Sequence, residues 1–165
     1  MTVEVSPAEV RTQLDSMANG MCADTRGVVA MLFKLGSEKL TSGVAELFTD
    51  IMRPTAEIPE YWKQGRLKVL FKKGDPKSVE NYRPITILPI LYKLFSKVLL
   101  AKVKDILSAQ QSVNQAGFRA GYSCDDHLFA VTLLAEMYKE FKSPLWLVAV
   151  DFRKAFDCLS HGCLW

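Results

Sequence analysis

The sequence lacks several features that would set it apart from ordinary globular proteins. No run of apolar residues approaches the roughly eighteen that a membrane-spanning helix needs. The N-terminal stretch MTVEVSPAEVRTQ has neither the basic nor the apolar segment of a secretory signal peptide. No internal repeat, low-complexity tract or linker composition is present. We therefore expect a single intracellular domain, in the nucleus or the cytoplasm, without a membrane partner.

Cysteine is also scarce. The four cysteines, at positions 22, 124, 158 and 163, form no Cys-x2-Cys pair and no dense framework, so we expect reduced thiols. Two Cys-x2-His pairs, Cys124 with His127 and Cys158 with His161, superficially match the ligand count of a structural zinc site. Because the first pair falls in the first turn of an expected helix, zinc is the less favoured alternative.

Charge is present in quantity but unevenly distributed. The chain carries a net +3, yet residues 1–60 hold nine acidic against five basic residues, which leaves nine acidic against sixteen basic in residues 61–165. The segment KQGRLKVLFKKGDPK (63–77) gathers six cations around the single acid Asp75. Such a run is either a solvated, lysine-rich hairpin or a site for nucleic acid or phosphate.

The hydrophobic pattern predicts a mainly helical chain, and 49% hydrophobic residues suffice for a buried core. Apolar residues at helical spacing predict four helices, over 25–35, 40–51, 89–107 and 123–141. The first two are expected to pack as an antiparallel pair. LKVLF (67–71) is an expected strand, and residues 108–122 are an expected long loop. The unbroken apolar run LWLVAV (145–150) predicts a strand buried on both faces.

This last expected strand ends at an acid, Asp151. In α/β architectures, ligands bind in the crevice outside the strand ends, so a metal is one partner for a carboxylate there. The neighbouring Arg153 and Lys154 support a competing interpretation, in which Asp151 caps a helix or forms an ion pair. Taken alone, the pattern favours the competing interpretation.

Four blocks in a fixed order change that balance: PEYWKQGRLKVLFKKGD, NYRPITILPILYKLFSKVL, QAGFRAGYSCDDHL and VAVDFRKAFDCLSHGCLW. Together they resemble the opening half of reverse transcriptases from non-LTR, LINE-type retrotransposons. With ADTRGVVAMLFK upstream, the resemblance covers roughly residues 20–165. It implies an α+β fold, a mainly helical fragment of a right-hand polymerase. Fingers and connecting helices would occupy about 20–144, and the first palm strand with its following helix 145–165.

The resemblance implies RNA-directed DNA polymerase chemistry, with an RNA template, a DNA primer and deoxynucleotide triphosphates as partners. Asp151 matches the first metal-binding aspartate of the palm and would bind Mg²⁺, together with the backbone carbonyl of Phe152. Phe156 falls at the steric-gate position that excludes a ribose 2′-hydroxyl, although a core aromatic would give the same pattern. Asp157 is assigned to structure.

Further binding residues are implied upstream. Lys72, Lys73 and Arg83 match fingers positions that grip the triphosphate of the incoming nucleotide, where Arg offers a planar fork and Lys a point charge. Which lysine does so stays open. A second fingers block, whose backbone amides would approach a template phosphate, is matched by Gly117, Arg119 and Gly121.

These 165 residues do not contain the family's later block, an aromatic-x-Asp-Asp hairpin. One carboxylate is too few to hold magnesium against water, so we expect weak or absent Mg²⁺ binding and no primer extension by this chain alone. The strand at 145–150 would lack its pairing partners, which favours marginal stability or self-association. The alternative function is a retrotransposon-derived, non-catalytic nucleic-acid-binding or interaction module.

Overall fold

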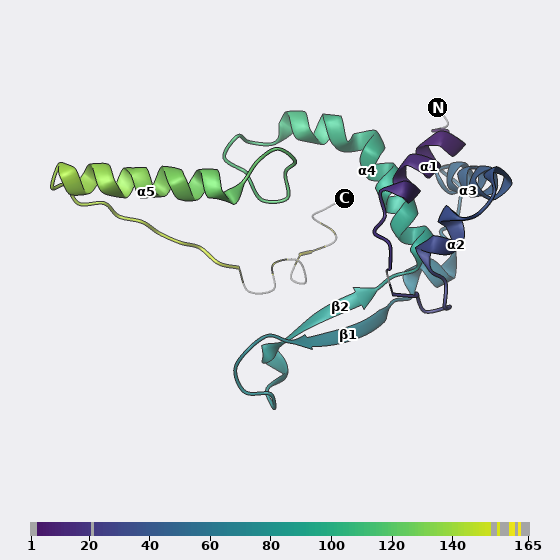
Figure 1. The fold of residues 1–165 in the computed structure, drawn as a ribbon, viewed down its shortest axis with the longest axis horizontal. Coiled ribbons are helices and arrows are strands. Elements are labelled where there is room, and N and C mark those ends of the chain that lie inside the picture. Colours follow the sequence, from purple (N-terminus) through teal and green to yellow (C-terminus); the bar gives the residue numbers. More distant parts are fainter. Residues whose placement is uncertain (1–2, 21, 153–154, 156–158, 161, 163–165) are drawn as a thin grey trace. The chain divides into compact units, whose positions relative to one another are not determined.

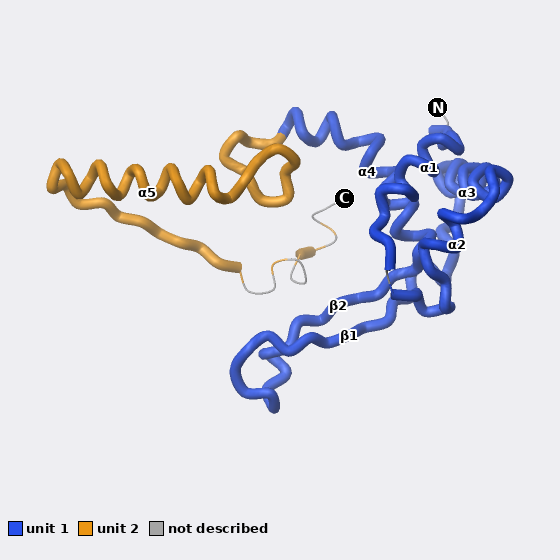
Figure 2. Tube along the Cα trace, viewed as in Figure 1, with its two compact units in different colours: residues 1–110 blue, residues 111–165 orange. Residues whose placement is uncertain are grey.

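The computed structural model describes residues 3–20, 22–152, 155, 159–160 and 162 (Figure 1). The chain divides into two compact units, residues 1–110 and residues 111–165 (Figure 2). The first contains the helices α1 (Pro7–Asp15), α2 (Ala30–Lys34), α3 (Glu38–Ile51) and α4 (Ile90–Gln110), the strands β1 (Arg66–Phe71) and β2 (Tyr82–Ile87), and the short 3-10 helices η1 (Glu60–Lys63) and η2 (Val79–Asn81). The second contains α5 (Cys124–Glu140). The described chain is therefore α+β, as expected, and none of its helices is long and apolar enough to cross a bilayer.

The hydrophobic pattern does not predict α1, although a capping box marks its start. The Glu9 N–H donates to Ser6 Oγ at 3.2 Å, and the Ser6 N–H donates to Glu9 Oε2 at 2.7 Å. Pro7 takes the first helical position, where its missing N–H costs nothing. Val10 and Leu14 bury the inner face of the helix. The pattern Ser-Pro-x-Glu at residues 6–9 thus predicts the start of α1, even though the helix has few apolar residues.

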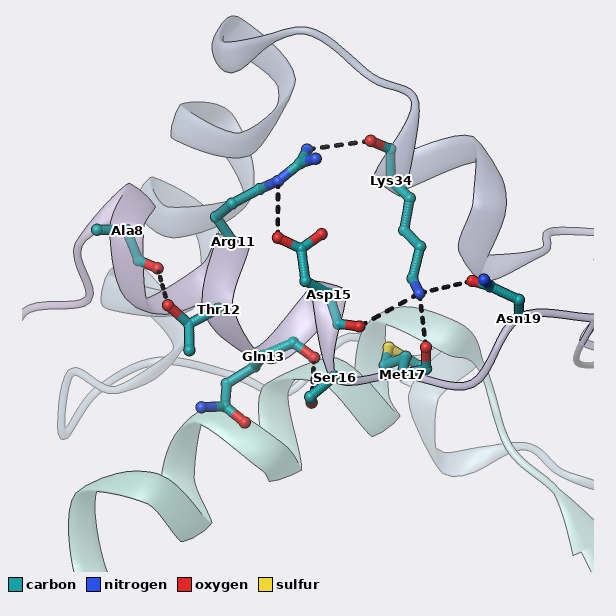
Figure 3. Close-up of polar contacts among 9 residues, drawn as sticks. All are labelled: Ala8, Arg11, Thr12, Gln13, Asp15, Ser16, Met17, Asn19 and Lys34. Atoms are coloured by element: carbon teal, nitrogen blue, oxygen red, sulfur yellow. Dashed lines mark hydrogen bonds and ion pairs between the residues drawn. The ribbon is translucent and has the colours of Figure 1, made fainter.

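Lys34 of α2 donates to carbonyls at the C-terminal end of α1, and Arg11 of α1 donates to the carbonyl of Lys34 at the end of α2 (Figure 3). Lys34 Nζ donates to the carbonyl oxygen of Met17 at 2.6 Å and to Asn19 Oδ1 at 2.8 Å. Arg11 donates from its guanidinium to the carbonyl of Lys34 at 3.0 Å. The last carbonyls of a helix lack intrahelical partners and carry partial negative charge, so an ammonium there satisfies both needs.

Helix α2 is shorter than the expected helix over 25–35. Asp24 folds residues 24–28 into a turn, since its Oδ1 accepts from the N–H groups of Arg26 at 2.9 Å and Val28 at 3.0 Å. The helix can begin only after this turn, at Ala30. The expected antiparallel pairing of this helix with α3 is also revised, because α1 is the element that packs against α2, α3 and α4.

Helices α1 to α4 and η1 all contribute buried side chains to the core of the first unit. Phe48 of α3 is fully buried, and Trp62 of η1 is 2% exposed. Their rings and that of Phe95 contact one another edge-on or tilted, with centroids 5.2 to 6.1 Å apart. The apolar stripe of α4 is covered only in its first half, from Ile90 to Val98, whereas Ile106 is 64% exposed in the described chain.

In the second unit, α5 begins where the sequence predicts. Ser123 is the N-cap, its Oγ accepting from the Asp125 N–H at 3.0 Å, and Asp126 Oδ2 completes a capping box by accepting from the Ser123 N–H at 3.4 Å. No residue of this helix is buried in the described structure. The local signal therefore sets the start of α5, while its apolar side chains, such as Phe129 at 70% exposure, stay uncovered.

The prediction of a buried strand at 145–150 is wrong for the structure as described. This segment is irregular, and Trp146 and Val148 are 89% and 88% exposed. A strand gains its stability from hydrogen bonds to a neighbour, and the strands within the described residues, β1 and β2, pair with each other. The first palm strand of the expected fold is thus not formed here, and most of the helix expected after it lies outside the described residues.

Candidate active site

The basic run of the sequence occupies β1 and the turn that follows it. Within this turn, the Asp75 carbonyl accepts from Asn81 Nδ2, and Asp75 Oδ1 accepts from the Lys77 N–H, both at 2.9 Å. Gly74 has φ +93°, and a Cβ there would lie 2.8 Å from Asn81 Nδ2. Only glycine adopts this conformation without strain and leaves room for the amide. The tip of the hairpin is therefore shaped by its own polar contacts.

Strand alternation separates the two faces of the hairpin. Leu70 pairs with Arg83, and cross-strand partners share a face, so Lys68, two residues before Leu70, lies on the Arg83 face as well. The Lys72 N–H donates to the Asn81 carbonyl at 2.8 Å, which extends the ladder by one pair. Lys72 therefore also belongs to the Arg83 face.

The opposite face of the hairpin is apolar. It carries Leu67, Val69 and Phe71 from β1, opposite Pro84 and Tyr82 from β2. The centroids of the Phe71 and Tyr82 rings lie 5.4 Å apart. Lys73 follows the last ladder pair and opens the turn. The structure thus brings Lys72 and Arg83 to one face, in diagonal positions, and separates Lys73 from them.

A buried acid anchors the base of this hairpin. Asp24 is 6% exposed, and its Oδ2 accepts from the N–H of Ile90, the first residue of α4, at 3.1 Å. Arg66, the first residue of β1, donates from its guanidinium to the carbonyl of Ala23 at 3.3 Å. β2 ends at Ile87, just before Ile90. Both ends of the hairpin are therefore tied to one loop.

The charge on Asp24 is favoured by its hydrogen bonds. Burial disfavours the ionised carboxyl, but the backbone N–H groups of Ile90, Val28 and Arg26 and the charge of Arg26 outweigh it and lower the pKa below the usual 3.8. The Arg26 guanidinium is itself held 4.3 Å above the Tyr61 ring. Sequence reasoning gave Asp24 no role, although an Asp three residues before a glycine marks a turn held by the acid's side chain.

The segment that we predicted to be a second fingers block forms the loop that connects α4 to α5 in the chain. Arg119 Nη1 donates to the Ser112 carbonyl at 2.7 Å, and its guanidinium stacks 3.8 Å from the centre of the Tyr122 ring. Gly121 has φ +80°, a value that favours glycine. Gly117 accepts at its carbonyl from Gln115 Nε2 at 3.1 Å. The three residues singled out from the sequence thus lie in one loop, with the guanidinium held in place.

Asp151 and Phe152 are exposed and lie on irregular backbone. With the described residues, Asp151 forms no ion pair, and these residues contain no group of three or more His, Cys, Asp or Glu side chains that could hold a metal. A lone carboxylate and one carbonyl do not make a magnesium site. Phe156, Asp157 and the Cys158/His161 pair lie outside the described residues. The metal-binding half of the expected site is therefore not assembled in the part of the chain that is described.

Comparison with known proteins defines the family. Residues 71–165 match the reverse transcriptase (RNA-dependent DNA polymerase) family, and the chain belongs to it. Over 109 residues it is 35% identical to a probable RNA-directed DNA polymerase from transposon X-element of Drosophila melanogaster, a match that covers 62% of this chain and 12% of that protein.

Two further relatives are similar. A probable RNA-directed DNA polymerase from transposon BS of Drosophila melanogaster is 30% identical over 109 residues, 64% of this chain and 12% of the relative. The Pol polyprotein from the type-1 retrotransposable element R2 of Popillia japonica is 31% identical over 111 residues, 65% of this chain and 15% of the relative. The resemblance to non-LTR retrotransposon polymerases is confirmed, and the chain spans 12 to 15% of the length of these relatives.

Proposed function

We propose that this chain supplies the nucleotide-gripping hairpin and the first metal ligand of an RNA-directed DNA polymerase, which transfers nucleotides to a primer 3′-hydroxyl on an RNA template. The observation that carries the proposal is the placement of Lys72 and Arg83 on one face of a hairpin whose base is anchored by Asp24. A triphosphate offers adjacent anionic groups, and this face offers adjacent cations to meet them.

The geometry favours Lys72 over Lys73 for the triphosphate. Diagonal residues of an antiparallel pair lie about 7–8 Å apart, close enough for Lys72 and Arg83 to reach neighbouring phosphates. Arg83 would bind two oxygens through its planar fork, and Lys72 would add a point charge. The residue before a proline favours extended backbone, so Pro84 supports the position of Arg83 in β2.

The template and metal assignments extend the same proposal. In the 111–123 loop, Arg119 uses Nη1 for the Ser112 carbonyl, which leaves its other donors for a template phosphate that would also contact the backbone of Gly117 and Gly121. Asp151 would give one hard oxygen to magnesium, with the Phe152 carbonyl as a second ligand, and the resemblance to the family implies that Phe156 selects against a ribose 2′-hydroxyl. Because one carboxylate cannot hold magnesium, we infer that these 165 residues alone do not extend a primer.

Binding of a deoxynucleotide triphosphate to the 165-residue chain tests the proposal. Charge-assisted hydrogen bonds are worth about 1.5–3 kcal/mol, so Lys72→Gln and Arg83→Gln should each weaken binding about tenfold, measured by calorimetry or NMR titration. Lys73→Gln, which removes the same charge one residue along the chain, should change affinity less than about twofold. Equal losses at Lys72 and Lys73 would contradict the assignment. RNA binding without triphosphate binding would support the non-catalytic module instead.

A further inference from the structure

A hollow of about 380 Å³ opens in the first unit, between the end of α1 and the first turns of α4. Met17 and Leu88 contribute apolar surface to it, and Tyr92, Lys93 and Lys97 line it from α4. We call it the α1–α4 hollow. None of its residues takes part in the hairpin tip, the 111–123 loop or the metal-binding segment, so its chemistry calls for a separate account.

The two lysines of the hollow have no carboxylate partner among the described residues. Lys97 Nζ donates to Ser16 Oγ at 3.0 Å. Lys93, one turn earlier on the same helix face, is half-buried, and its ammonium group makes no hydrogen bond or ion pair to the described residues. The nearby acids of α1 are already matched, Glu9 by Lys102 at 2.5 Å and Asp15 by Arg11 at 3.2 Å. The hollow therefore carries net positive charge, which attracts an anion.

The aromatic wall of the hollow is held in position by the core. The Tyr92 ring lies 6.0 Å from the Trp62 ring at an interplanar angle of 61°, and it is half-buried. Leu88 and Met17 extend the apolar surface beside it. An aromatic ring next to apolar surface, bordered by cations, is the combination that single-stranded nucleic acids use, with a base against the ring and phosphates at the cations.

The wall contributed by α1 is equally fixed (Figure 3). Ser16 Oγ donates to the Gln13 carbonyl at 2.7 Å while it accepts from Lys97. Lys34 Nζ donates to the carbonyl of Met17, the residue that follows Ser16. Lys97 is thus presented at a defined position before any ligand arrives, which reduces the entropy lost on binding.

We propose that the α1–α4 hollow binds one unstacked nucleotide of single-stranded RNA, with phosphate oxygens at Lys93 and Lys97 and the base against Tyr92 and Leu88. Charge complementarity selects a polyanion, and the apolar surface beside the ring selects a base that is free to leave its stack, which a duplex does not offer. The choice of RNA rests on the proposed function, in which RNA is the template. The hollow gives that strand a contact separate from the triphosphate site.

The test measures binding of a short, fluorescently labelled single-stranded RNA to the 165-residue chain by anisotropy at several salt concentrations. The double variant Lys93→Gln/Lys97→Gln should weaken binding about tenfold. It should also flatten the slope of log affinity against log salt by about 1.4, because each phosphate neutralised on a single strand contributes about 0.7. The matched control, Lys39→Gln/Lys139→Gln, removes the same charge from exposed positions and should leave affinity within about twofold.

Two further measurements complete the test. Tyr92→Phe keeps the ring and should bind RNA like the unchanged chain, whereas Tyr92→Leu should weaken binding at least about threefold while its thermal melt shows that it folds. An unchanged salt slope in the lysine double variant, an equal loss in the control, or tighter binding of duplex than of single-stranded RNA would overturn the inference. Triphosphate binding is measured on the same variants. If the variants of the hollow bind RNA as tightly as the unchanged chain does, and triphosphate binding is observed, the inference fails while the proposed function stands.

Discussion

Replacing Asp24 by asparagine should loosen the base of the hairpin without unfolding the helices around it. The Oδ1 atom of Asp24 accepts from Arg26 and Val28, and Oδ2 accepts from Ile90. Asparagine has the same shape but only one oxygen, so its amide nitrogen would face the Ile90 N–H, a donor against a donor. The turn at 24–28 can survive this change, but the link to α4 cannot.

The size of the effect follows from the burial of the site. Asp24 is 6% exposed, so water cannot replace the lost acceptor. A hydrogen bond to a charged group contributes about 1.5–3 kcal/mol, and an unsatisfied buried N–H costs about 1–3 kcal/mol. Both values describe the same contact, so they are not added. We expect Asp24→Asn to lower the free energy of unfolding by about 2 kcal/mol. Asp24→Ala, which also opens the turn, should lower it by about 3 kcal/mol.

Urea denaturation followed by tryptophan fluorescence measures this loss, because unfolding exposes the buried Trp62, and hydrogen exchange of the Ile90 amide locates it. The control is Asp50→Asn, which removes a carboxylate that pairs with Arg53 on the surface, where both side chains are more than half exposed. Exposed pairs contribute little, so the control should unfold close to the unchanged chain. The reasoning would be refuted by equal midpoints for Asp24→Asn and Asp50→Asn together with unchanged exchange at Ile90.

Three further predictions concern pH, the hairpin turn and self-association. The hydrogen bond from Lys102 is the main cause that lowers the pKa of Glu9 below 4.5, and the pKa of Asp24 lies below 3.8, so both stabilise the fold above these values. The urea midpoint should therefore be flat near neutral pH and fall as the pH drops below about 4.5; a midpoint that rises on acidification would contradict this. Gly74→Ala should cost about 1–2 kcal/mol because of its φ of +93° and the crowded Cβ position, whereas Gly43→Ala, in the middle of α3 with open space around it, should stabilise by up to about 1 kcal/mol in the same assay. The exposed run at 145–150 should drive self-association in analytical ultracentrifugation, and Val148→Lys should shift the population towards monomer; a concentration-independent monomer in the unchanged chain would count against it.

Local signals in the sequence predicted the elements whose ends are fixed by nearby residues. Ser123 and Asp126 lie three residues apart and set the start of α5 by themselves. The strand over 67–71 is confirmed, and its partner β2 is the next strand along the chain, after the connection at 72–81. The buried strand at 145–150 was wrong because a strand depends on a partner, and its apolar composition says nothing about where that partner lies. The Asp24 anchor was missed for a related reason, since its contact with Ile90 joins residues 66 positions apart.

The difference between local and long-range contacts also determines which of the two adjacent lysines shares a face with Arg83. In the sequence, Lys72 and Lys73 are equivalent, because each is a cation next to the turn. In the ladder they differ, since side chains alternate between faces and a slip of one residue would exchange them. The register is held at the tip by the bond from Lys72 to Asn81 and at the base by the ties of β1 and α4 to the loop around Asp24. A buried acid far from the tip thus helps to determine which lysine shares a face with Arg83, and a loosened base in Asp24→Asn should narrow the difference in triphosphate affinity between Lys72→Gln and Lys73→Gln.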